Sequence, residues 1–343
     1  MDDNVFKISD QINTVTEGFR HVVILGAGAS KASCLNKAEK NGKDIPLMND
    51  LPKFIDLNDE LKDLSKELRN KNFELIFSTL FDKEPNSERL QSIEQKIYDF
   101  FRSLNLPDEP SIYDYLVLSL RQKDLIATFN WDPFLIQAYQ RNSIFTTNLP
   151  KLAFLHGNVS VGIDIDSKTV GINGQICSKS GNLFQPTKLL YPIKHKDYNS
   201  DTFVKSQWNL LSQYLRNPAR VTIFGYSAPK TDVEAINIMK KAWGNPETNQ
   251  QFTQFEIIDI QPESKLKESW KNFIFSHHYE VTKNFFKSSI LRFPRRTGEV
   301  FNANYLEAKI CEENYPPKFK TLQEMWNWYK PFIYKETENI NDK

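Results

Sequence analysis

Residues 21–30 read HVVILGAGAS, and this stretch decides the fold. Its apolar, mostly β-branched residues run into Gly26, Ala27 and Gly28, a pattern typical of a buried parallel strand that turns into a helix. Glycine permits the tight turn, and the missing Cβ lets a phosphate group approach the backbone amides, with Ser30 following in the helix. The dehydrogenase fingerprint GxGxxG is not matched, because Lys31 stands where its last glycine would be. The alternative is a plain strand-to-helix turn that binds nothing.

Four more apolar runs of strand length follow, at residues 124–130, 152–158, 219–227 and 255–261. Helical patterns such as DPFLIQAYQR and TDVEAINIMKKAW lie between them. Strands that alternate with helices predict an α/β fold with a Rossmann-like parallel sheet flanked by helices.

Three regions fall outside that alternation. Residues 51–120 place apolar residues three and four apart and predict a helical insert, whereas residues 161–181 predict a hairpin or an excursion loop. Beyond Arg292 the sequence KTLQEMWNWYKPF predicts one further helix. We therefore expect one domain over residues 1–290 and a helical C-terminal extension over 291–343. The extension is a candidate assembly segment, although core packing also explains its aromatic residues.

Composition narrows the class of protein. The 343 residues include 44 basic and 43 acidic side chains, a balance that argues against an extended nucleic-acid interface. No apolar run is long enough for a membrane span, and the first residues, MDDNVFKISD, lack the layout of a signal peptide. We therefore expect a cytoplasmic protein. Cys34, Cys177 and Cys311 are too far apart for a Cys-x-x-Cys metal pair, and we expect free thiols and no metal.

The segment ATFNWDPFL places Asn130 and Asp132 just beyond the end of a predicted strand. Ligands of open α/β sheets bind at the carboxyl ends of the strands, so an amide and a carboxylate here are suited to hold ribose hydroxyls or a water molecule. The alternative is that one of them caps the next helix, in which Pro133 suits the first turn. Capping and ligand contact are compatible.

The segment FLHGN places His156 at the end of another predicted strand, next to Gly157. An imidazole in that position is suited to act as a general base near neutral pH. A structural histidine is the alternative.

Two later strand ends carry weaker signals. In TIFGYSAPKTD, Gly225 and Ser227 would place a backbone turn and a hydroxyl over a bound nucleotide, and we expect Asp232 to cap the following helix. In EIIDIQP, Asp259 ends a strand and could bind an adenosine ribose or base edge.

Taken in this order, GAGAS, TFNWD, LHGN, FGYS and the strand ending in Asp259 resemble the sirtuin-like NAD-binding family over roughly residues 15–285. The resemblance implies roles for the strand-end residues. Gly26, Ala27, Gly28 and Ser30 would hold the pyrophosphate of NAD, Asn130 and Asp132 the nicotinamide ribose and the attacking water, His156 would be the catalytic histidine, and Ser227 and Asp259 would contact the adenosine half.

Two departures from the family bear on the reaction. Sirtuin deacylases carry a zinc module with two Cys-x-x-Cys pairs, which three scattered cysteines cannot build. The family's Ile-Pro-Asp-Phe-Arg stretch is replaced by IPLMNDL, which keeps only Ile45 and Pro46. What remains is similar to the zinc-less sirtuin-like domains of bacterial antiviral systems, which hydrolyse cellular NAD.

The resemblance thus implies an NAD⁺ glycohydrolase that releases nicotinamide and ADP-ribose and depletes NAD in antiphage defence. It also implies control by a homo-oligomer or by a partner, an ATPase or a nucleic-acid-guided protein, with no direct binding of membrane or nucleic acid by this chain. Two alternatives keep the fold: a non-catalytic sensor of NAD or ADP-ribose, and a protein deacylase. An ordinary dehydrogenase would need a glycine in place of Lys31.

Overall fold

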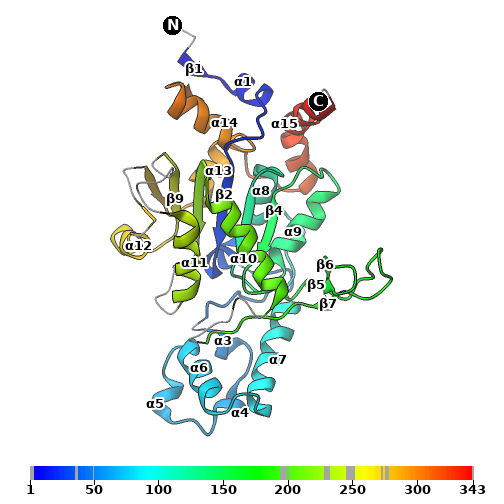
Figure 1. The fold of residues 1–343 in the computed structure, drawn as a ribbon, viewed down its shortest axis with the longest axis vertical. Coiled ribbons are helices and arrows are strands. Elements are labelled where there is room, and N and C mark those ends of the chain that lie inside the picture. The colour runs from blue at the N-terminus through cyan, green and yellow to red at the C-terminus, as the bar shows by residue number, and fades with distance from the viewer. Residues whose placement is uncertain are drawn as a thin grey trace.

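The molecule is built around a six-stranded parallel sheet (Figure 1). The computed structural model describes residues 4–34, 38–48, 50–193, 198, 201–227, 232–244, 252–271, 273–274 and 278–341. The strands lie in the order β10-β9-β8-β2-β3-β4. Their bounds are β2 His21–Leu25, β3 Leu125–Thr128, β4 Lys151–Phe154, β8 Arg220–Phe224, β9 Gln254–Ile258 and β10 Tyr279–Thr282. All residues of β2, β3, β8 and β9 are buried, as the continuous apolar runs predict for a parallel sheet.

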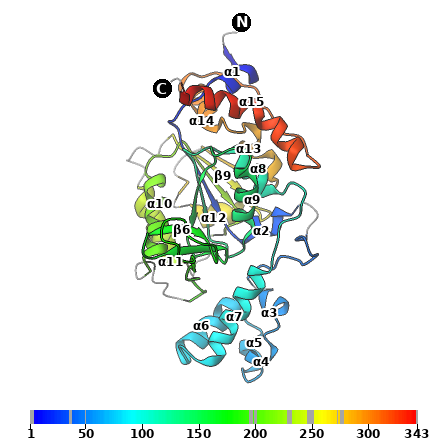
Figure 2. The same cartoon turned by 90° about the vertical axis from the view of Figure 1, so that its right-hand side faces the viewer.

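Helices cover both faces of this sheet, which confirms the predicted α/β class (Figure 2). Two of them, α10 (Thr202–Leu215) and α11 (Val233–Trp243), pack together on one face. The other face carries α2 (Ala27–Ser33), α8 (Ile112–Ser119) and α9 (Phe134–Ser143). Between β9 and β10 the chain forms α12, Glu263–Trp270.

The predicted helical insert is present and projects from one end of the sheet (Figure 1). Its helices are α3 Leu51–Phe54, α4 Asn58–Leu61, α5 Lys66–Arg69, α6 Phe73–Lys83 and α7 Glu88–Arg102. Helix α7 begins where the Ser87 side chain accepts a hydrogen bond from the Leu90 amide, and it buries Leu90, Ile93, Ile97 and Phe101 along one face. Helix α8 lies within the range predicted for the insert, residues 51–120, but it belongs to the main core, where all eight of its residues are buried.

Residues 161–186 form a small separate sheet beside the main one, in the order β6-β5-β7. The strands β5 (Val161–Asp164) and β6 (Thr169–Ile172) are antiparallel, which confirms the predicted hairpin. The short strand β7 (Gln185–Pro186) pairs with the other side of β5.

The two ends of the chain meet at the opposite end of the main sheet from the insert (Figure 1). There β1 (Val5–Phe6) pairs with β11 (Ile310–Cys311), and α1 (Ile8–Asn13) contacts α15 (Leu322–Asn341). The other elements here are η2 Phe285–Lys287, α13 Ser289–Arg292, α14 Thr297–Phe301 and the π-helical η3 Asn302–Leu306. The expected domain boundary between residues 290 and 291 falls inside α13, which contacts α8, and α14 contacts β8.

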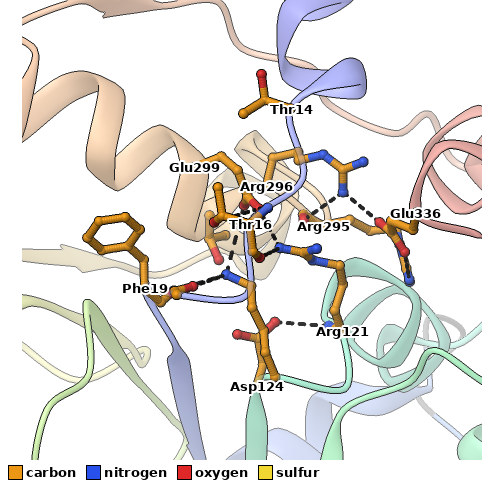
Figure 3. Close-up of polar contacts among 12 residues, drawn as sticks. Thr14, Thr16, Phe19, Arg121, Asp124, Arg295, Arg296, Glu299 and Glu336 are labelled. Atoms are coloured by element: carbon orange, nitrogen blue, oxygen red, sulfur yellow. Dashed lines mark hydrogen bonds and ion pairs between the residues drawn. The ribbon is translucent and has the colours of Figure 1, made fainter. Parts of the chain in front are cut away.

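Buried ion pairs join these end segments to the core (Figure 3). Glu336 of α15 accepts hydrogen bonds from Arg295 Nη2 at 2.5 Å and from Arg296 Nη1 at 2.6 Å. Beside them, Glu299 pairs with Arg121, and the Lys123 ammonium lies 3.9 Å from Glu299. Burial alone would raise the pKa of Glu336, but the two arginines lower it to about 2.

Within the described residues, no helix is both long and apolar enough to cross a bilayer.

Candidate functional site

A cleft of about 960 Å³, including the part that is open to solvent, lies at the carboxyl ends of β2, β3, β4 and β8. Its walls come from the strand-end segments, from the residues before and within the helical insert, and from the segment after β4. The lining residues are Gly26, Ala27, Ser30, Ile45, Pro46, Leu47, Met48, Leu51, Glu74, Phe101, Phe129, Asn130, Trp131, Asp132, His156, Leu190, Pro192, Gly225, Tyr226, Ser227 and Asp232. The cleft therefore brings together residues from four of the predicted strand ends.

Two glycine turns form the floor of the cleft by packing against each other. Gly225 has a φ of +62°, and a Cβ added to it would lie 2.3 Å from the Ala29 nitrogen. The Gly28 amide donates to the Gly225 carbonyl at 3.0 Å, and a Cβ on Gly26 would lie 2.5 Å from the same carbonyl oxygen. Gly26 and Gly225 face the cleft, whereas Gly28 lies outside its lining and uses its amide within the protein. In this structure the need for glycine at these positions comes from backbone packing.

A buried polar cluster joins the segment after β2 to the segment after β3. Asn130 Nδ2 donates to the Gly26 carbonyl and to Ser30 Oγ, both at 2.8 Å. Ser30 Oγ in turn donates to Asp132 Oδ2 at 2.5 Å and lies 2.9 Å from the Tyr113 hydroxyl. Asp132 Oδ1 accepts the Phe134 amide at 3.2 Å, so this carboxylate contacts the start of α9 as well as the cleft. Burial raises the pKa of Asp132 to about 6, against the opposing effect of these hydrogen bonds.

Asn158 fixes the loop that carries Asn130 and Asp132. Its Nδ2 donates to the Asp132 carbonyl at 2.6 Å and to the Asn130 carbonyl at 3.3 Å. The preceding Gly157 has a φ of +75°, and a Cβ there would lie 2.2 Å from the Lys188 carbonyl oxygen. The segment after β4 is thereby held against the segment after β3.

His156 lies on the cleft wall as one member of a chain of polar side chains. Its Nε2 is 3.1 Å from the Tyr198 hydroxyl, which donates to Asp232 Oδ1 at 3.4 Å. Tyr226 also donates to this carboxylate, at Oδ2 and 3.0 Å. The Tyr198 hydroxyl has one hydrogen and gives it to Asp232. In the contact between Tyr198 and His156, the imidazole Nε2 is therefore the donor. The lone pair of the neutral imidazole is then on Nδ1. Phe129 packs edge-on against the ring at a centroid distance of 4.9 Å.

The expected capping role of Asp232 is wrong. Asp232 directly precedes α11, but its side chain makes no capping hydrogen bond, because its two oxygens receive the hydroxyls of Tyr198 and Tyr226. Burial raises the pKa of both tyrosines, so they remain neutral donors.

The two residues expected at the adenosine half lie at the same edge of the sheet but differ in position. Ser227 is exposed and lines the cleft. Asp259 is half-buried outside the lining, where its Oδ1 accepts the Gln261 amide at 2.9 Å in a local turn. Contact of Asp259 with adenosine stays a prediction.

The described residues contain no group of three or more histidine, cysteine or acidic side chains that could hold a metal ion. Cys34, Cys177 and Cys311 are free thiols on separate parts of the fold. The segment 161–186, which follows β4 and His156 and forms the small sheet β5–β7, contains one cysteine, Cys177.

No family model matches the chain, and no curated protein matches its sequence. Its fold is similar to that of a solved structure of Sir2 with the inhibitor EX-527, 2'-O-acetyl-ADP-ribose and a deacetylated p53 peptide, at 13% identity and a TM-score of 0.36 over 84% of this chain and 94% of that chain. A structure of Sir2 with a p53 peptide and NAD⁺ is similar at 12% identity and a TM-score of 0.37, over 88% of this chain and 97% of that chain. A third, described as the structural basis for the mechanism and regulation of Sir2 enzymes, has 13% identity and a TM-score of 0.37 over 90% of this chain and 100% of that chain.

Proposed function

We propose that the chain binds NAD in the strand-end cleft and hydrolyses the bond between nicotinamide and ribose, releasing nicotinamide and ADP-ribose. One observation carries this proposal: His156, Asn130 and Asp132 line a single cleft at the carboxyl edge of the parallel sheet. A pure binding site has little need for an imidazole and a buried carboxylate in the same cleft.

The reaction needs positioning and charge stabilisation more than a strong nucleophile. Nicotinamide leaves as a neutral molecule, and the ribose passes through a cationic, oxocarbenium-like state before water adds. His156 accepts the proton of the attacking water or of a ribose hydroxyl, while Tyr198 and Asp232 hold the ring in orientation.

Asn130 and Asp132 have separate roles in this mechanism. The Nδ2 of Asn130 is already engaged by Gly26 and Ser30, and among the described residues no donor reaches its Oδ1. This oxygen is suited to accept a hydrogen bond from a ribose hydroxyl or from the attacking water. With its pKa near 6, Asp132 is largely ionised at neutral pH and stabilises the cationic ribose.

We further propose that the enzyme acts in the cytoplasm, consumes NAD as its substrate without a metal ion, and depletes it in antiphage defence. The single cysteine in β5–β7 supports the distinction from zinc-containing deacylases, because such a module needs four thiolates. Since a constantly active NADase harms its own cell, the proposal includes control by a homo-oligomer or by a partner ATPase or nucleic-acid-guided protein.

The first test measures nicotinamide release from NAD by the purified chain. Wild type is compared with His156→Ala, with Asn130→Ala, and with Asn182→Ala as an exposed asparagine outside the cleft. We expect His156→Ala to lower turnover by roughly a hundredfold to ten-thousandfold, the usual contribution of a general base. NAD affinity, measured by calorimetry, should change little in His156→Ala, and Asn182→Ala should match wild type in both assays.

Other outcomes separate the alternatives. Tight NAD binding without release of nicotinamide in any sample would indicate a sensor or an enzyme that awaits its partner. Release that requires an acetyl-lysine peptide would indicate a deacylase. Absence of NAD binding would contradict the proposal that the strand-end cleft binds NAD.

A further inference from the structure

A second cavity lies at the opposite edge of the sheet from the cleft, at the amino ends of β8, β9 and β10. Its volume is about 1170 Å³, including the part that is open to solvent. Arg220, Gln254 and Tyr279, the first residues of these three strands, form one wall. The other wall comes from residues 289–313, which include α13, η3 and β11. The C-terminal extension thus closes a pocket over the sheet edge.

Arg220 is the unusual feature of this cavity. It is 8% exposed and lines the pocket, yet no hydrogen bond or ion pair of its guanidinium exists within the described residues, and its Nε is fully buried without a partner. A buried charge without a partner is costly and is rare in folded proteins. Burial lowers the pKa of Arg220, but the group remains a cation at neutral pH because arginine titrates far above it.

The acidic side chains around Arg220 are already engaged by other donors. Glu256 accepts the Ser289 amide at 2.7 Å and the hydroxyls of Ser289 and Thr222, both at 2.9 Å. None of these contacts involves Arg220, which has no carboxylate within ion-pair distance among the described residues.

The second arginine of the cavity differs from Arg220 because it is neutralised. Arg292 lies 2.8 Å from Glu280 and 3.5 Å from Glu313. Among the described residues that line the cavity, Arg220 therefore carries the one positive charge without an ion-pair partner.

We propose that this cavity is a binding site for a small organic monoanion whose carboxylate is held by the guanidinium of Arg220. The planar fork of arginine matches a carboxylate through two parallel hydrogen bonds. Glu280 and Glu313 disfavour a dianion such as a phosphate monoester, because they add negative charge to the same lining. Phe255, Phe293 and Tyr305 supply apolar surface for an aromatic or aliphatic body.

The test uses benzoate as the monoanion, benzamide as its neutral analogue and phenyl phosphate as the dianion. Binding to the full chain is measured by calorimetry and by the ligand-induced shift in melting temperature. Wild type is compared with Arg220→Met and with Arg216→Met, which removes an exposed arginine four residues away. We expect benzoate to bind wild type and Arg216→Met alike, and Arg220→Met about tenfold to a hundredfold more weakly, while benzamide does not bind.

Stability without ligand separates a binding role from a structural one. Because the Arg220 guanidinium makes no hydrogen bond or ion pair within the described residues, Arg220→Met should melt at the same temperature as wild type or higher. If that variant does not fold, Arg220→Lys keeps the charge without the fork and should still weaken benzoate by about tenfold. Equal benzoate affinity in wild type and the Arg220 variants, or no saturable binding to wild type, would overturn the proposal. Tighter binding of phenyl phosphate than of benzoate would overturn its assignment to a monoanion.

Discussion

The Asp132 carboxylate holds its proton more tightly in the folded protein than in the unfolded chain. Burial moves its pKa from 3.8 to about 6, even though Ser30 and the Phe134 amide donate to it. The protonated carboxyl group therefore contributes to the stability of the folded state. This contribution is fully present below pH 3.8 and is lost as the pH rises through about 6. Wild type should therefore lose stability over this interval, relative to a variant whose side chain at this position stays neutral.

Asp132→Asn supplies that neutral side chain. The free energy of unfolding of the variant minus that of wild type should rise by roughly 2 to 3 kcal/mol between about pH 4 and pH 8, since one pKa unit corresponds to about 1.4 kcal/mol. Altered hydrogen bonding to Ser30 adds an offset that is independent of pH and leaves this slope unchanged. Urea denaturation of both proteins at several pH values measures the difference, and two parallel curves would contradict the raised pKa.

At the scale of elements, the turn after β2 and the turn after β8 fit together only because Gly225 has no side chain. An alanine there would adopt a φ of +62° and place its Cβ 2.3 Å from the Ala29 nitrogen. Gly174 is a matched control, because its φ is +81° but nothing lies within 4 Å of an added Cβ. The two positions share the cost of left-handed backbone and differ in the clash.

We expect Gly174→Ala to cost about 1 kcal/mol of unfolding free energy and Gly225→Ala about 3 kcal/mol or more, because the clash adds an overpacking term. Urea denaturation measures both values. NAD affinity should fall in Gly225→Ala alone, since Gly225 lines the cleft and Gly174 does not. Equal losses of stability would show that the two turns can separate without cost.

The strand ends were predictable from sequence because a buried parallel strand leaves a continuous apolar run that stops at a polar residue. That signal located Asn130, Asp132 and His156, all of which line the cleft. Tyr198 and Tyr113 had no such signal, since neither stands at a strand end and both reach the site through tertiary packing. The edge strand β10 was not predicted, because it is short and only partly buried and so leaves no continuous apolar run.

Asp232 shows a different limit of the sequence. An aspartate before a helix has the pattern of an N-cap, and only the positions of Tyr198 and Tyr226 reveal that its oxygens are used elsewhere. Local sequence cannot encode which of two acceptor roles a carboxylate takes when the competing donors lie on other elements.

At the scale of the whole molecule, the C-terminal extension is integral to the fold. Met325 and Tyr329 of α15 are fully buried, and Glu336 neutralises Arg295 and Arg296, which lie about 40 residues earlier in the chain. Truncation of the extension would leave both arginines buried and unpaired, which is costly. The predicted homo-oligomer is therefore best examined on the full chain, by light scattering.

Glu336→Gln tests whether the extension and the sheet unfold together. Removal of one partner from a buried ion pair costs roughly 3 to 5 kcal/mol, because it leaves the remaining charges without compensation. Glu338→Gln is the matched control on the same helix, since Glu338 pairs with Lys335 at the surface and should contribute no more than about 1 kcal/mol.

Both pH dependence and hydrogen exchange report on this network. The pKa of Glu336 is lowered from 4.5 to about 2, so its stabilisation is present above pH 4.5 and is lost as the pH falls through 2. At neutral pH, the amides of α15 and of β2 should exchange with the same free energy of opening in wild type. Glu336→Gln should lower this free energy by the same amount for α15 and for β2. In a single cooperative unit, the loss of a buried charge lowers the free energy of opening at every protected amide. If Glu336→Gln accelerated exchange in α15 alone, the extension would therefore be a separate folding unit, and its ion pairs would stabilise only that unit.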